Sequence, residues 1–332
     1  MKRTYTNPVH EAYLADPYAW RHDSLYFAIG TGATEAAGSV ATSPSKQPTI
    51  FPVLRSRDLV RWREIGHALV RPDPSFGDTF WAPEIVRTDG GWLLYYSVGW
   101  QDRLHQIRVA RSEKPWGPFV DLAGLTDPRV CPFAIDPHPF RDRDGAWYLF
   151  HARDFLNEVD DEGRAARAGT ALVAYALDDM TKLAPTGVTV ARARWDWQRF
   201  AGNRQMYGRV FDWHTLEGPF VVLRDGRYYC FYSAGCWRTD TYGVDYVVAD
   251  SVLGPYSDAG AEQGPRILRT VPERVMGPGH CSVISDPDVG SHVLVYHAWG
   301  PDMTARRLCI DTLSFGATGP RSPGPTWAEQ TL

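Results

Sequence analysis

Five similar stretches recur along the chain, and this internal repeat constrains the fold more than any other feature of the sequence. In each stretch an acid or a histidine is followed by apolar residues, a polar turn and a run rich in aromatic residues. Repeats of this length, each with several strand-like runs, are typical of the blades of a β-propeller. The copies cover residues 16–30, 82–97, 136–150, 217–231 and, less clearly, 280–287 with 292–296.

The composition favours short strands over long helices. The chain has 30 glycines and 25 prolines, and 13% of its residues are aromatic, which suits strands separated by turns. Asp-Gly pairs such as Asp89-Gly90 are typical of hairpin turns. We therefore predict an all-β, five-bladed β-propeller that forms a single catalytic domain over residues 1–332.

Charge and hydropathy exclude several classes of partner. A net charge of -4 makes nucleic acid a poor partner. No run approaches the roughly 18 apolar residues of a membrane span, and no apolar segment follows the first residues, so we expect a cytoplasmic protein without a membrane partner. The five cysteines are scattered without metal-ligand spacing and are expected to be buried free thiols: Cys131, Cys230, Cys236, Cys281 and Cys309.

Three repeats place an acid beside or two residues before a proline, at the start of a predicted inner strand. These acids are Asp16, Asp136 and Glu217. Inner strands of a propeller line its central channel, so the three carboxyl groups are expected to meet in one pocket. Like charges at close range raise the pKa of at least one member, which allows an acid and a base to coexist as glycoside hydrolysis requires.

A structural role is the alternative for each acid taken singly, because an acid before proline commonly caps a turn. Three acids at matching places favour the catalytic interpretation. Glu84 belongs to the same repeat phase but follows Pro83, and we interpret it as structural.

The same motifs resemble glycoside hydrolase family 43 in order and spacing over nearly the full chain. The resemblance implies a five-bladed propeller that cleaves arabinofuranosyl or xylosyl linkages with inversion. It rests on residues 15–17, 81–84, 135–137, 216–219, 279–280, 296–299 and 306–311.

This resemblance also implies roles for the three acids. Asp16 would be the general base that deprotonates water, Glu217 the general acid that protonates the departing oxygen, and Asp136 the residue that tunes and orients the acid. An inverting pair must leave room for water, which predicts a separation of about 6.5 to 9.5 Å between the Asp16 and Glu217 carboxyl groups.

Further residues are candidates for contact with substrate. Trp81 offers a flat face to a sugar ring, with blade packing as the alternative. His280 is expected on the axis, where it would bind substrate, hold Asp136 or help to bind a cation; a core histidine is the alternative. Arg307 is the candidate near Asp136, although strand alternation gives Arg306 an equal claim.

An aromatic and arginine-rich insertion, residues 194–200 through 211–214, leads into Glu217. It is expected to form a substrate wall or to pack between blades. No cofactor is expected to be required. The metal content stays open, with a structural calcium ion held by water and backbone oxygens near His280 as one possibility.

The sequence therefore predicts an exo-acting α-L-arabinofuranosidase that acts on small oligosaccharides. A β-xylosidase is the nearest alternative, and a carbohydrate-binding propeller without activity is the alternative from another class. The presence of all three acids favours an enzyme. Endo against exo action, anomeric preference and oligomeric state are left open by the sequence.

Overall fold

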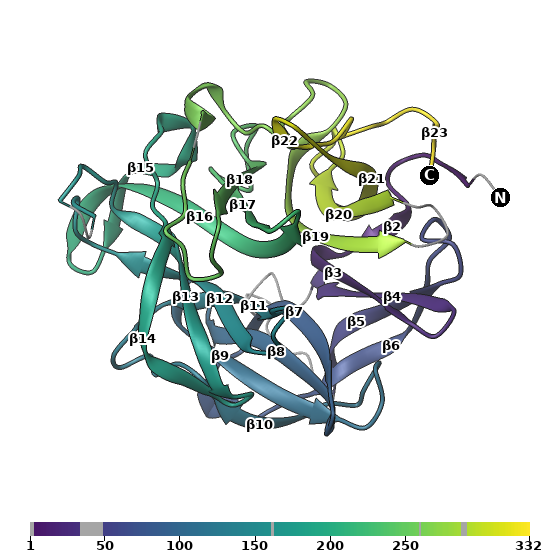
Figure 1. Cartoon of the computed structure of the whole chain (residues 1–332), viewed down its shortest axis with the longest axis horizontal. Helices are drawn as coiled ribbons and strands as arrows, with labels where there is room; N and C mark the ends of the chain where they lie inside the picture. Colours follow the sequence, from purple (N-terminus) through teal and green to yellow (C-terminus); the bar gives the residue numbers. More distant parts are fainter. Residues whose placement is uncertain (1–2, 34–48, 161–162, 259, 287–290) are drawn as a thin grey trace.

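The computed structural model describes residues 3–33, 49–160, 163–258, 260–286 and 291–332. Within these residues the strands form five blades arranged in a ring (Figure 1), which confirms the predicted β-propeller. The described residues leave out Met1 and Lys2. They also leave out Pro287, which ends the predicted repeat at residues 280–287. Among the described residues, no helix has the length and apolar character needed to cross a membrane.

The first two blades are antiparallel sheets of four strands in sequence order from the axis outward. Blade 1 consists of β3 (Ala15–His22), β4 (Leu25–Thr31), β5 (Thr49–Ser56) and β6 (Arg63–Val70). Blade 2 follows a 3₁₀ turn, η1 (Pro74–Phe76), and consists of β7 (Thr79–Thr88), β8 (Gly91–Trp100), β9 (Arg103–Ser112) and β10 (Val120–Gly124).

Blades 3 and 4 are joined into one sheet, because β13 and β16 pair in parallel at Gly169–His214 and Thr170–Thr215. Blade 3 consists of β11 (Ala134–Arg141), β12 (Trp147–Phe155), β13 (Gly169–Asp179) and β14 (Lys182–Ala191). Blade 4 consists of β16 (Arg209–Arg224), β17 (Arg227–Ala234) and β18 (Gly243–Ala249), with β15 (Arg199–Met206) added beside the first half of β16 after the short turn η2 (Asp196–Gln198).

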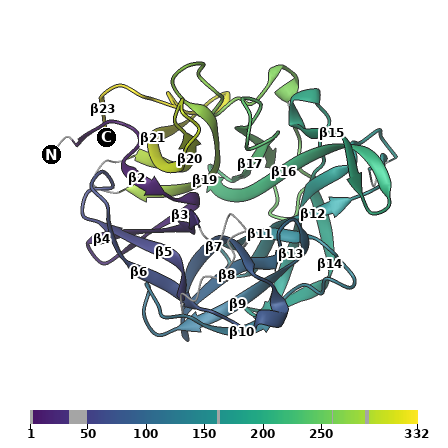
Figure 2. The same ribbon diagram turned by 180° about the vertical axis from the view of Figure 1, so that it is seen from behind.

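Blade 5 closes the ring with a strand from the other end of the chain. Its strands β19 (Met276–Asp286), β20 (Ser291–Trp299) and β21 (Arg306–Gly316) are completed by β2 (His10–Tyr13), which pairs with β21. The chain ends lie close together (Figure 2), where β1 (Thr4–Tyr5) pairs with β23 (Gln330–Thr331). The remaining short elements are η3 (Ala261–Gln263) and β22 (Gly319–Arg321).

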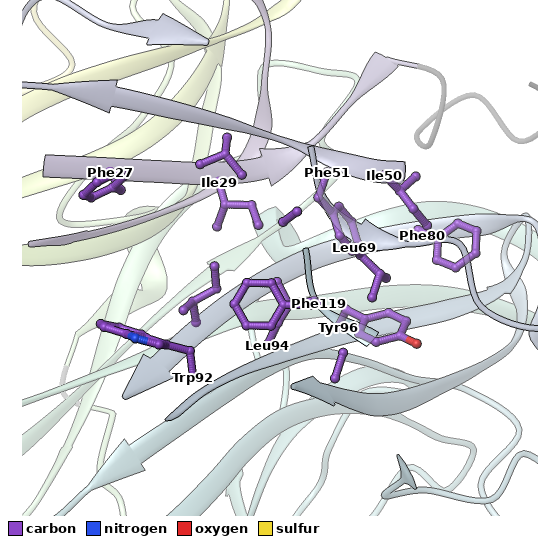
Figure 3. Close-up of a cluster of buried hydrophobic side chains, with 14 of the residues drawn as sticks. Phe27, Ile29, Ile50, Phe51, Leu69, Phe80, Trp92, Leu94, Tyr96 and Phe119 are labelled. Carbon is purple, nitrogen blue, oxygen red and sulfur yellow. The ribbon is translucent and has the colours of Figure 1, made fainter. Parts of the chain in front are cut away.

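The hydrophobic core is divided among the spaces between neighbouring blades. Figure 3 shows the cluster between blades 1 and 2, where Phe27 and Phe51 face Leu94 and Tyr96. Further clusters occupy the spaces between blades 2 and 3, 3 and 4, 4 and 5, and 5 and 1. Burial of these aromatic and β-branched side chains stabilises each blade against the next, and the inner strands keep their places around the axis.

Candidate active site

The inner strand of every blade is interrupted by a β-bulge at the same place. At each bulge one residue has left-handed backbone angles: Asp16, Ala82, Asp136, Gly218 and His280 have φ between 47° and 59°. A bulge bends its strand and redirects a side chain. Asp16, Asp136 and His280 therefore line one pocket. Glu217 lines it too, so the three acids converge as predicted.

The bulges correct the repeat phase assigned to Glu217 and Glu84. Glu217 comes one residue before its left-handed residue, Gly218, and so matches Trp81 rather than Asp16. Glu84 comes two residues after Ala82, away from the pocket, and its carboxylate lies 2.9 Å from His138 Nδ1. Sequence alone could not set this phase, because a bulge adds one residue without a fixed composition.

Gly218 is required where blades 3, 4 and 5 meet. Its φ of 58° is rare for other residues, and an added Cβ would lie 3.1 Å from the His280 ring. The Gly218 N–H donates to Asp136 Oδ2 at 2.9 Å. The glycine after Glu217 thus lets Asp136 and His280 lie against the backbone beside the acid.

Neighbouring blades are linked at the bulges by a ring of hydrogen bonds. A side chain at the end of one blade's second strand accepts from the N–H of the next blade's left-handed residue: Thr31 from Ala82, Ser97 from Asp136, Ser233 from His280 and His297 from Asp16. The corresponding residue of blade 3 is Ala152, which has no hydroxyl group. Asp136 takes its place as the acceptor for Gly218.

Asp16 is placed to remain a carboxylate. Thr31 donates to its Oδ2 at 2.7 Å, and Arg306 Nη1, His280 Nδ1 and His297 Nδ1 lie 3.4, 3.4 and 3.5 Å from its Oδ1. Burial raises the pKa of Asp16, but its interactions with His280, Arg306, His297 and Thr31 outweigh this and lower the pKa to about 2. Burial lowers the pKa of both histidines, so Arg306 is the persistent positive charge.

The pKa values of Glu217 and Asp136 are raised, in contrast to that of Asp16. Burial, with repulsion from Asp16, raises the pKa of Glu217 to about 7, although Tyr242 donates to its Oε1 at 2.6 Å and lowers the pKa in part. Burial and repulsion from Glu217 and Asp16 raise the pKa of Asp136 well above its ordinary value. Near neutral pH this pair therefore keeps a proton beside an ionised Asp16.

Two of the predicted substrate-binding residues, Trp81 and His280, line the pocket. Trp81 lines the pocket and stacks on the buried His105 ring, with centroids 3.8 Å apart. His280 lines the pocket between two acids, 3.4 Å from Asp16 and 3.9 Å from Asp136.

Arg307 does not reach the axis, and this prediction was wrong. Its guanidinium donates to the Glu11 carbonyl at 3.0 Å, whereas the neighbouring Arg306 lines the pocket. Adjacent residues of a strand point to opposite sides, and the pairing of β21 turns Arg306 inward.

Two residues that donate hydrogen bonds to the acids were missed by sequence reasoning. Tyr242 comes from the segment between β17 and β18, outside any repeat motif, and the hydroxyl group of Thr31 lies at the end of a second strand. Matching the ends of second strands across repeats was the signal that could have found Thr31, Ser97 and Ser233. The predicted insertion does form part of the wall, through Phe200, Arg204, Met206 and Trp213.

The described part of the chain contains no group of three or more His, Cys, Asp or Glu side chains arranged to hold a metal ion. Arg306 already places a positive charge beside Asp16, near His280. A calcium ion there stays an unconfirmed prediction. The five cysteines are free, as expected, but Cys131 and Cys236 are only partly buried, so the expected burial was wrong for these two.

Comparisons with known proteins agree with this geometry. The model of Glycosyl hydrolases family 43 matches residues 5–320. The chain is 29% identical to the β-D-galactofuranosidase xynD of Aspergillus niger, over 94% of this chain and 83% of that protein. It is 26% identical to an extracellular exo-α-(1→5)-L-arabinofuranosidase of Streptomyces chartreusis, over 89% and 82%. The crystal structure of a thermostable family-43 glycoside hydrolase superposes with a TM-score of 0.80 at 28% identity, covering 98% of both chains. Other relatives are named as arabinanases and xylosidases.

Proposed function

The chain belongs to glycosyl hydrolase family 43 and is a glycoside hydrolase, and from this we propose that it removes terminal arabinofuranosyl residues from small oligosaccharides with inversion. The observation that carries the proposal is the contrast between two carboxyl groups of one pocket. Asp16 is held ionised, whereas burial raises the pKa of Glu217 to about 7, so that Glu217 keeps its proton at lower pH. This is the division between base and acid that hydrolysis of a glycosidic bond needs.

In the proposed reaction Asp16 accepts a proton from the attacking water. The water oxygen bonds to the anomeric carbon as the bond from that carbon to the departing oxygen breaks. The electron pair of the broken bond goes to the departing oxygen, which takes the proton of Glu217. The products are a free sugar of opposite anomeric configuration and a shortened alcohol, with Asp16 protonated and Glu217 ionised until solvent restores them.

Asp136, Arg306 and Tyr242 act on these two groups. Arg306 stabilises the charge of Asp16, so that the base is ready over a wide pH range. Asp136 binds the Gly218 N–H beside the acid, and the pair resists losing its last proton. Tyr242 fixes one oxygen of Glu217 and leaves the other for the departing group.

Support for a furanoside substrate comes from the relatives reported above, two of which are named for galactofuranose and arabinofuranose. A β-xylosidase is the second candidate, because another relative, from Xylanibacter ruminicola, carries that name. Both sugars would place an anomeric carbon between Asp16 and Glu217.

The test is an assay of the purified protein on matched nitrophenyl and disaccharide glycosides of arabinofuranose, xylose and galactofuranose. We expect the highest kcat/KM on the arabinofuranosides, and proton NMR of the first product to show the inverted anomer. Glu217→Ala should lower kcat on the disaccharide about 10²- to 10⁴-fold, and less on the nitrophenyl glycoside, whose leaving group needs little protonation. A retained anomeric configuration, or a preference for xylosides, would contradict the proposal.

A further inference from the structure

A second polar cluster lines the pocket apart from the three acids, and no role in the reaction uses it. We call it the outer cluster: Asp102, Asp154, Thr170, Arg204 and Tyr207. Its members come from blades 2 and 3 and from the hairpin of β15 and β16, and the first four of them line the pocket itself.

Arg204 links two elements that line the pocket. Its Nη2 donates to Asp102 Oδ2 at 2.8 Å and joins the β15–β16 hairpin to the turn between β8 and β9. The guanidinium carbon lies 4.8 Å from the Phe200 ring centroid and 5.7 Å from that of Trp213. These contacts fix its plane, and a guanidinium has five N–H donors, so one bond to Asp102 does not exhaust it.

Asp154 is the acceptor of the cluster. It takes hydrogen bonds from Thr170 Oγ1 at 2.8 Å and from the Tyr207 hydroxyl at 2.7 Å. Burial raises its pKa to about 6, so it is mostly ionised at neutral pH. A carboxylate has about four lone-pair sites, and two donors leave capacity for hydroxyl groups in the pocket.

The outer cluster lies on the side of the acid. Thr170 pairs with Thr215 on β16, and Thr215 is two residues before Glu217, so the two side chains share a face of the strand. The sugar that carries the departing oxygen must lie on the side of the group that protonates it. Aromatic walls with a few placed charged groups are typical of sites that bind small polar ligands.

We propose that Asp154 and Arg204 bind hydroxyl groups of a second sugar residue, the one released with the departing oxygen, and make the enzyme selective for oligosaccharides over simple glycosides. The proposal rests on the proposed function, because it takes Glu217 as the acid. Asp102, Thr170 and Tyr207 are positioning residues that orient this pair.

The experiment compares two substrates with the same terminal sugar, a nitrophenyl glycoside and a disaccharide. The nitrophenyl ring can pack on Phe200 and Trp213 but offers no sugar hydroxyl groups. Asp154→Asn and Arg204→Met should each lower kcat/KM on the disaccharide about 10- to 100-fold, as expected for a lost hydrogen bond to a charged group. On the nitrophenyl glycoside the change should stay below about threefold. Arg204→Lys should restore part of the loss.

Arg209→Met is the matched control, since Arg209 is an exposed arginine of the same hairpin that lies outside the pocket. It should leave both substrates unaffected. Equal losses on both substrates, or no loss on the disaccharide, would overturn the proposal. If Arg204→Met does not fold, as judged by circular dichroism, Asp154→Asn carries the test, because an amide keeps the shape and its hydroxyl partners can rotate.

The proposed function fails separately from this proposal. A wild-type protein that cleaves xylosides in preference to arabinofuranosides would refute the arabinofuranosidase activity. The same comparison would then be made with nitrophenyl xyloside and xylobiose, where selective loss on the disaccharide still supports the outer cluster and equal loss still refutes it.

Discussion

Arg306 is one of the groups that keep Asp16 ionised, together with His280, His297 and Thr31. Arg306 is the one of two neighbouring arginines whose Nη1 lies 3.4 Å from Asp16 Oδ1. Removing a nearby positive charge raises the pKa of a carboxyl group, so Arg306→Met should move the acidic limb of the pH–activity profile to higher pH. We expect kcat/KM at neutral pH to fall about 10- to 100-fold. Arg307→Met is the control, and equal profiles for the two variants would contradict this assignment.

Tyr242 lowers the pKa of the acid, Glu217, against the effect of burial. Its hydroxyl donates to Glu217 Oε1 and favours the ionised form of Glu217. Tyr242→Phe should therefore raise the pKa of Glu217 further and move the alkaline limb above its wild-type position near pH 7. The measurement is kcat/KM against pH. An alkaline limb that stays in place or moves to lower pH would show that another group sets it.

Single residues were predicted unevenly from the sequence. Asp16, Asp136, Glu217, Trp81 and His280 belong to repeat motifs, and the structure brings all five to the pocket. Arg306 and Arg307 could not be distinguished, because the face of a strand depends on its pairing register. Tyr242 lies outside the repeats, so nothing in its sequence context links it to the acid.

At the scale of the strands, the bulges position the site residues, and blade 3 lacks the side-chain acceptor that the other four blades provide at the end of their second strands. Ala152→Ser would supply the missing acceptor and compete with Asp136 for the Gly218 N–H. Because Asp136 would then shift beside Glu217, kcat should fall about tenfold while Tm stays within about 2 °C of the wild type. Ala176→Ser, farther out in the same blade, is the control. An unchanged kcat would show that the bond from Gly218 to Asp136 is dispensable.

The positions of the strands were predicted better than their irregularities. Alternating aromatic and apolar residues with Asp-Gly turns located the inner hairpins, and Asp225 and Gly226 both have positive φ, as the favoured two-residue turn requires. The one-residue bulge was not predictable, because Asp16, Ala82 and Gly218 share no side-chain property. The phase given to Glu217 was wrong by one residue for that reason.

For the molecule as a whole, closing the ring buries Glu217 at the centre, and this burial makes its ionised form unfavourable. A carboxyl group whose pKa is raised in the folded state contributes stability below its unfolded pKa, and this is lost as pH rises through the folded pKa. For Glu217 the window runs from its ordinary value of 4.5 to about 7. Between pH 5 and pH 8, Glu217→Gln should therefore gain about 1–3 kcal/mol of unfolding free energy relative to wild type.

Urea denaturation at the two pH values measures this difference. Glu113→Gln, which replaces an exposed glutamate, should show no such gain. A Glu217→Gln variant that tracks the wild type at both pH values would mean that the folded protein places no penalty on ionisation of Glu217.

The arrangement of the blades could be predicted from the repeat, but the strand pairings that connect the blades could not. Each blade packs on the next through its own cluster of apolar side chains, which is why five repeats suffice to predict a ring. The parallel pairing of β13 with β16 and the addition of β2 to blade 5 depend on contacts between distant segments. The insertion was recognised by composition, whereas its ion pair from Arg204 to Asp102 was not predictable from sequence.

The central claim is that the folded ring keeps a proton on Glu217 while Asp16 is ionised. Carbon-13 NMR titration of protein labelled at the glutamate carboxyl carbons tests this directly, with Glu217→Gln to identify the resonance. We predict that the resonance lost in the variant titrates with an apparent pKa of about 7 in the wild type. A titration near the ordinary glutamate value of 4.5 would contradict the account.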